Sequence, residues 1–86
     1  MTTNEKIVKE IDSIQKELLQ KNIDYGDSLQ NPIGVFQKDK MQGLLGRLDD
    51  KLNRIKAVGI NDKTEDTIGD LIGYLIHLKI MLKDNV

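Results

Sequence analysis

The segment 64–83 is the feature that most constrains the fold of this chain. Its apolar residues follow a helical spacing but cover more than one face, and a helix that is apolar on most sides is buried on most sides. These residues are Ile68, Leu71, Ile72, Leu75, Ile76, Leu78, Ile80, Met81 and Leu82. A chain of 86 residues can hardly cover so much apolar surface alone, and small chains gain from oligomerisation.

Two earlier segments, 3–21 and 35–58, show the period of amphipathic helices. Their apolar stripes consist of Ile7, Ile11, Ile14 and Leu18 in the first segment and of Met41, Leu44, Leu45, Leu48, Leu52 and Ile55 in the second. Gly59 is placed to end the second helix. We therefore expect an all-α protein of one domain, residues 1–86, in which three antiparallel helices complete a helical bundle by dimerisation or higher oligomerisation.

The connection 22–34 is rich in turn residues and is long for a compact domain. Long loops of this kind often carry function, because they place side chains without the constraint of a regular element. A plain connection between helices, with Tyr25 covering the core, is an equally good interpretation.

Composition narrows the function classes. The 13 basic and 14 acidic residues nearly cancel, so we expect no direct nucleic-acid binding. Without cysteine, neither a disulfide framework nor a thiolate metal site can form. The apolar run 68–82 is interrupted by charged residues and is too short for a membrane span, and the polar N-terminus does not resemble a secretory signal. We expect no membrane association and a cytoplasmic location.

Charged residues lie beside the apolar stripes of the second and third helices. On the second helix, one face carries Arg47, Asp50, Lys51 and Arg54, and on the third a similar line carries Asp66, Asp70, Tyr74 and His77. If these helices pack antiparallel across the short 59–63 turn, the basic residues of the second helix lie opposite the acids of the third. A charged cluster should therefore form at the edge of the core.

Asp70 interrupts an apolar run, and a buried carboxylate is costly unless a metal, a ligand or an arginine pairs with it. One interpretation is an Arg–Asp network that only fixes the register of the helices. The other is a mixed-charge pocket in which carboxylates hold Mg²⁺, the candidate cofactor, while Arg and Lys hold phosphates. His77, the single histidine, is more typical of a partly buried packing residue than of a ligand or base.

Three motifs follow one another along the chain. They are Lys-Asn-Ile-Asp-Tyr-Gly-Asp-Ser at 21–28, Arg-Leu-Asp-Asp-Lys-Leu-Asn-Arg at 47–54 and Glu-Asp-Thr-Ile-Gly-Asp-Leu-Ile-Gly-Tyr at 65–74. In this order they resemble the nucleotide modification associated domain 1 family. That family is common in bacteriophage genomes and is similar to the all-α nucleoside triphosphate pyrophosphohydrolases of the MazG type. The resemblance implies a nucleotide-type ligand and a helical assembly with sites near the subunit interface.

The MazG-type enzymes bind Mg²⁺ between a Glu-Glu-x-x-Glu helix and a Glu-x-x-Asp helix. The resemblance places Asp49, Asp50 and Asp70 at acid positions of these motifs, and Asp66 stands beside a further one. At two other acid positions this chain has the uncharged Asn53 and Thr67.

Lys51 and Arg54 also bring positive charge to the place where the enzymes gather negative charge. Positive charge there favours direct binding of phosphate. The substitutions therefore favour binding over catalysis, and no catalytic residue is assigned.

The leading hypothesis is a phage nucleotide-binding protein that holds a phosphorylated nucleotide in a mixed-charge pocket, with sequestration of a signalling nucleotide as an anti-defence role. The candidate ligand-binding residues are Arg47, Lys51 and Arg54 for phosphate and Asp24, Tyr25 and Asp27 for base or sugar. The candidate metal ligands are Asp49, Asp50, Asp66 and Asp70. The alternatives are a Mg²⁺-dependent MazG-like pyrophosphohydrolase and a non-catalytic structural helical oligomer.

Overall fold

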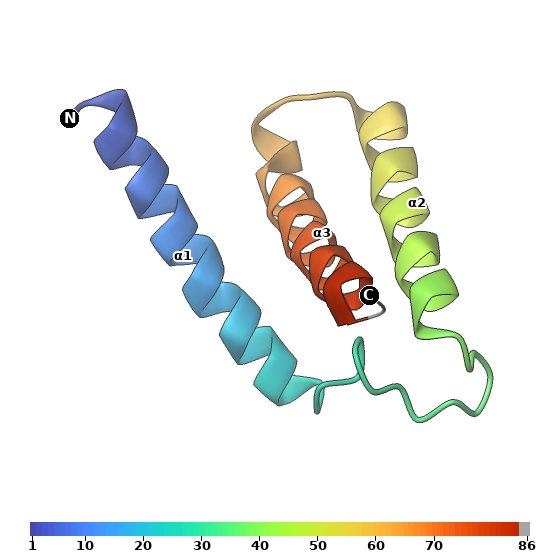
Figure 1. Cartoon of the computed structure of the whole chain (residues 1–86). Helices are drawn as coiled ribbons and strands as arrows, with labels where there is room; N and C mark the ends of the chain where they lie inside the picture. The colour runs from blue at the N-terminus through green and yellow to red at the C-terminus, as the bar shows by residue number, and fades with distance from the viewer. Residues whose placement is uncertain (85–86) are drawn as a thin grey trace.

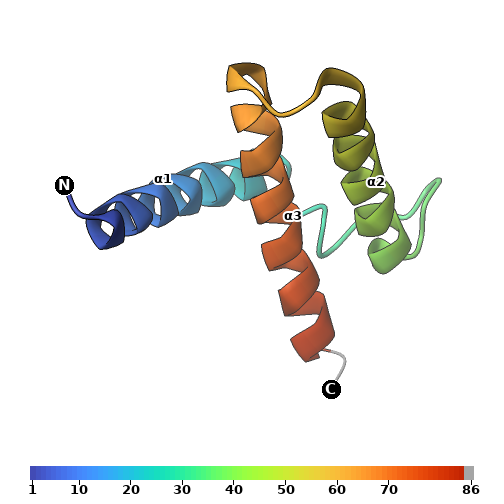
Figure 2. The same cartoon turned by 90° about the horizontal axis from the view of Figure 1, so that it is seen from above.

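The computed structural model describes residues 1–84, and this part of the chain contains helices and no strand. The elements are α1 (Thr3–Asp24), α2 (Lys40–Val58), a short 3₁₀ helix η1 (Asp62–Thr64) and α3 (Glu65–Asp84). Helices α2 and α3 lie antiparallel and side by side, and α1 meets the other side of α3 at an angle (Figures 1 and 2). The predicted all-α class is confirmed. None of the helices in the described range combines the length and apolarity needed to cross a membrane.

A side-chain cap decides where α2 begins. The Asp39 carboxylate accepts hydrogen bonds from the backbone N–H groups of Met41 and Gln42, at 2.9 and 3.2 Å. These N–H groups have no partner within the helix, so an acidic cap sets the first turn. The prediction of a helix from residue 35 is therefore wrong at its start. Because α1 also continues to Asp24, the connection is 25–39 rather than 22–34.

The turn between α2 and α3 is closed by local hydrogen bonds. Gly59 follows α2 with φ of 84°, and its N–H donates to the carbonyl oxygen of Ile55, so the predicted end of the helix is confirmed. Asn61 and Thr64 then form a reciprocal capping box around η1. This short turn brings α3 back along α2, as the antiparallel arrangement requires.

The buried core is small and lies between α2 and α3. Its hydrophobic members are Leu44, Leu48 and Met81, which are 1%, 9% and 0% exposed. No residue of α1 is buried. The stability of the single chain therefore depends mainly on the α2–α3 pair, with α1 attached to it by a short contact.

Glycines allow α1 to approach α3. A Cβ atom added at Gly73 would lie 3.1 Å from Leu18 Cδ1, and one added at Gly69 would lie 3.6 Å from Ile14 Cδ1. Ile14 and Leu18 belong to the apolar stripe predicted for the first helix. The close contact thus uses the C-terminal half of that stripe.

The two glycines should respond differently to alanine. Through helix propensity, either substitution should raise the free energy of unfolding by as much as about 1 kcal/mol. At Gly69 the added methyl meets Ile14 at an ordinary contact distance, whereas at Gly73 it must displace Leu18. We expect Gly69→Ala to have a higher free energy of unfolding than Gly73→Ala, as measured by urea titration. Equal stability of the two variants would contradict the close α1–α3 contact at Gly73.

Candidate functional site

A cavity of about 360 Å³ lies where α1, the 25–39 connection, α2 and α3 meet. It lies within the usual size range of small-molecule sites, at the lower end. Its basic side chains come from α1 and α2, and its two acids come from α1 and α3. The charged lining residues are Glu17, Lys21, Arg47, Lys51 and Asp70. The cavity lining thus carries charges of both signs.

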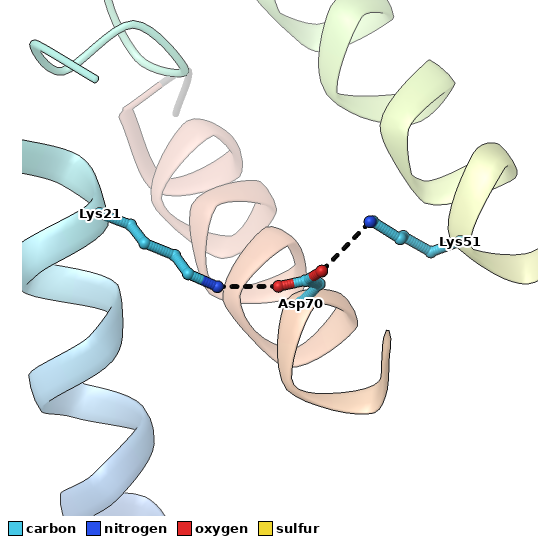
Figure 3. Close-up of polar contacts among 3 residues, drawn as sticks. All are labelled: Lys21, Lys51 and Asp70. Atoms are coloured by element: carbon cyan, nitrogen blue, oxygen red, sulfur yellow. Dashed lines mark hydrogen bonds and ion pairs between the residues drawn. The ribbon is translucent and has the colours of Figure 1, made fainter. Parts of the chain in front are cut away.

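Asp70 holds two ammonium groups in the wall of this cavity. Its Oδ1 lies 2.9 Å from Lys21 Nζ on α1, and its Oδ2 lies 3.1 Å from Lys51 Nζ on α2 (Figure 3). The Asp70 and Lys51 side chains are only 23% and 20% exposed, so each charge needs the other. The partner of Asp70 in this structure is therefore a pair of lysines rather than an arginine.

These contacts shift the ionisation of the cluster. Partial burial opposes the charge of Asp70, but the hydrogen bonds and charges of Lys21 and Lys51 outweigh it and hold the pKa of the carboxyl below its ordinary value. The hydrogen bond to Asp70 raises the pKa of Lys21 against the smaller, opposite effect of burial. Asp70 and Lys21 are therefore both charged at neutral pH.

Asp70→Asn should lower the free energy of unfolding at pH 7 by about 1–2 kcal/mol, because an amide cannot offset two ammonium charges. Water screens the half-exposed Lys21, which keeps the effect below that of a fully buried pair. Since the pKa of Asp70 is lower in the folded state, its contribution is present above the unfolded-state pKa and is lost as the pH falls through the folded-state pKa. Urea titrations of both proteins should converge in acid. A difference that persists there would contradict this origin.

His77 connects α3 to the 25–39 connection at the other end of the cavity. Gln30 Nε2 lies 3.0 Å from His77 Nδ1 and 3.1 Å from the His77 carbonyl oxygen, and Lys40 Nζ lies 3.5 Å from Gln30 Oε1. His77 is 6% exposed. Burial lowers the pKa of its imidazole, against a smaller opposite effect of the Asp27 charge. His77 is therefore neutral at physiological pH.

The structure brings half of the predicted ligand-binding residues into the cavity lining. Arg47, Lys51 and Tyr25 line it. Arg54, Asp24 and Asp27 lie outside this lining. Asp24 accepts a hydrogen bond from Gln20 at 2.9 Å, and Asp27 accepts one from Asn31 at 2.6 Å. These two acids take part in local contacts of the α1 end and the connection.

The four predicted metal ligands are spread over the molecule. Asp49 and Asp50 are exposed on α2, whereas Asp66 lines a second cavity at the N-terminal end of α3, which Asp70 also borders. Within residues 1–84, no three His, Cys, Asp or Glu side chains gather closely enough to hold a metal ion. Both carboxylate oxygens of Asp70 instead face ammonium groups. Magnesium binding remains a prediction.

Two residues that position the site were missing from the sequence prediction. Lys21 lies three residues after Leu18, where the stripe of α1 would continue, so a charge at an inner position was the signal that could have revealed it. Gln30 lies in the connection, where no periodic pattern reports which way a side chain points.

Comparison with known proteins adds no assignment. No protein-family model, no curated protein and no solved structure matches this chain.

Proposed function

We propose that this protein binds a phosphorylated, nucleotide-type small molecule in the cavity between α1, α2 and α3. The observation that carries the proposal is the Lys21–Asp70–Lys51 bridge, with Arg47 in the same lining. An ammonium group has three N–H donors, so each lysine keeps donors for phosphate oxygens while Asp70 holds it in place. The three basic groups exceed the two acids of the lining, which leaves the cavity favourable for an anion.

The remaining lining suits the nucleoside part of such a ligand. Tyr25 and Tyr74 bring aromatic rings to the cavity, and Asn22 and Ser28 bring polar groups that can bind a sugar or base edge. Stacking of a base on an aromatic ring contributes about 1–3 kcal/mol. The cavity volume of about 360 Å³ suits a small molecule rather than a polymer.

The lysine pairing of Asp70 supports retention of the ligand over Mg²⁺-dependent hydrolysis. Two ammonium groups take the carboxylate oxygens that a metal ion would need. A protein that binds a nucleotide without converting it would act by sequestration. The nucleotide that we propose it sequesters is a signalling nucleotide. If the protein is phage-encoded, it would act in the host cytoplasm.

We also propose that the active form is a homo-oligomer. The chain exposes 6895 Å² and has a radius of gyration of 14.4 Å. A compact monomer of 9.8 kDa would expose about 5,200 Å², and one of this length would have a radius of gyration of about 12 Å. The excess of about 1,700 Å² matches what one protomer buries in an obligate homo-oligomeric interface.

The N-terminal half of α1 supports the proposal of such an interface. Ile7 and Ile11 continue the stripe that packs on α3 through Ile14 and Leu18, but they lie beyond the contact and are 50% and 61% exposed. Figure 2 shows this half of α1 running away from α3. A second copy of the chain is the partner that would complete the helical bundle.

A retention assay tests the binding function. The protein is incubated with a panel of nucleotides, with and without Mg²⁺, then separated from free ligand, denatured and analysed for what it releases. We expect intact nucleotide in the released fraction. Recovery of monophosphate and pyrophosphate would instead support the pyrophosphohydrolase, and neither retention nor turnover would leave the structural oligomer.

A further inference from the structure

The contacts of Gln30 assign the tautomer of His77. Lys40 Nζ can only donate, so the atom of the Gln30 amide that faces it is the oxygen, and the amide nitrogen faces His77. That nitrogen also donates to the His77 carbonyl oxygen, which agrees with the same orientation. The atom 3.0 Å away, Nδ1, must therefore accept a hydrogen bond. In a neutral imidazole the proton is then on Nε2.

The Nε2–H group is the part of the His77 side chain that can face the cavity. In residues 1–84, no hydrogen bond reaches His77 Nε2, yet every fully buried side-chain nitrogen or oxygen atom in this range has a partner. Nε2 must therefore touch open space, although His77 as a whole is 6% exposed. The space that His77 lines is the cavity described above.

His77 and the Lys21–Asp70–Lys51 bridge lie at two ends of one face of α3. His77 lies seven positions after Asp70, which corresponds to two turns and about 10 Å along α3. Gly73 and Tyr74 lie between them and also line the cavity. One ligand can therefore meet the lysines at one end and the imidazole at the other.

We propose that His77 presents a fixed Nε2–H donor that recognises an acceptor atom, a ring nitrogen or a carbonyl oxygen, of the base of a bound nucleotide. Gln30 is the positioning residue that holds the imidazole in this tautomer. The proposal depends on the nucleotide-binding function proposed above and deepens it. Such a donor selects for ligands that carry a heterocycle with an acceptor atom about 10 Å from the phosphate.

The tautomer can be measured without any ligand. His77 is the single histidine of the chain, so long-range ¹H–¹⁵N correlation spectra report one imidazole only. We expect the Nε2–H pattern at neutral pH, and a loss of this preference in Gln30→Met, which removes the amide. An Nδ1–H pattern in the wild-type protein would overturn the assignment.

Two variants then test recognition. Asparagine at 77 can keep an acceptor near the position of Nδ1 but does not reach that of Nε2, whereas glutamine reaches it with an N–H group. The probes are the four ribonucleoside monophosphates and inorganic pyrophosphate. For the monophosphate that the wild-type protein binds most tightly, we expect His77→Asn to weaken binding about tenfold, the loss of one hydrogen bond of about 1.4 kcal/mol. His77→Gln should retain more of the affinity, and pyrophosphate binding should be unchanged in both variants.

The outcomes separate the two proposals. Suppose that the wild-type protein binds a monophosphate. If His77→Asn binds it equally well, or loses affinity for pyrophosphate to the same extent as for the monophosphate, base recognition by His77 is overturned while nucleotide binding stands. If the wild-type protein binds none of the monophosphates and retains no nucleotide of the panel, the nucleotide-binding function itself fails, and base recognition falls with it.

Discussion

Ile11→Asp is expected to dissociate the proposed homo-oligomer into monomers. Ile11 is 61% exposed in the single chain, in the half of the α1 stripe that α3 does not cover. Burial of such a side chain contributes about 1.5–3 kcal/mol, and a carboxylate placed there would be buried without a partner. We expect subunit association to weaken at least about a hundredfold, since each 1.4 kcal/mol is a tenfold change.

Sedimentation velocity, with mass determined by light scattering, would measure this change. Lys9→Asp is the matched control, because it introduces the same side chain on the opposite face of α1. The control should keep the mass of the wild-type oligomer. A wild-type protein that is already monomeric, or an Ile11→Asp variant with unchanged mass, would contradict an interface on this face.

The second large effect concerns the basic side chains of α2. The double variant Arg47→Ala, Lys51→Met should lower nucleotide affinity by about 100-fold or more, because hydrogen bonds to a charged group contribute about 1.5–3 kcal/mol each. Methionine keeps the apolar stem of Lys51 and removes its charge. Asp70 keeps Lys21 as a partner in this variant.

Arg54→Ala is the control on the same helix. Arg54 belongs to the charged face predicted from the sequence but lies outside the cavity lining. We expect its loss to change affinity less than about threefold, which corresponds to a weak, screened surface charge. Isothermal titration with the nucleotide recovered in the retention assay would compare the three proteins. An equal loss in Arg54→Ala would place the ligand on the outer face of α2 rather than in the cavity.

The sequence predicted the helical class and the paired faces because both depend on local periodicity. Residues three and four apart must share a helix face, so the apolar stripes and the charged line of α2 follow from spacing alone. A short turn after Gly59 can only return the chain antiparallel, and this arrangement places Lys51 opposite Asp70. The start of α2 was missed because a single capping interaction at Asp39 outweighs the apolar pattern before it.

The position of α1 was decided by the tertiary structure. Two glycines on α3 let Ile14 and Leu18 approach, and the angle of that contact carries Lys21 onto Asp70 and leaves Ile7 and Ile11 uncovered. Spacing within α1 cannot report which neighbour it meets or at what angle, because that depends on contacts between residues far apart in the chain.

The sequence by itself thus determined three helices, their apolar faces and the approach of the charged faces of α2 and α3. The tertiary structure alone decided that Lys21 and Lys51 are the partners of Asp70 and that Gln30 contacts His77. The physical reason is the same in both cases. Helical periodicity is a local property, whereas a cavity forms between segments whose distances depend on close packing and on hydrogen bonds from an irregular connection.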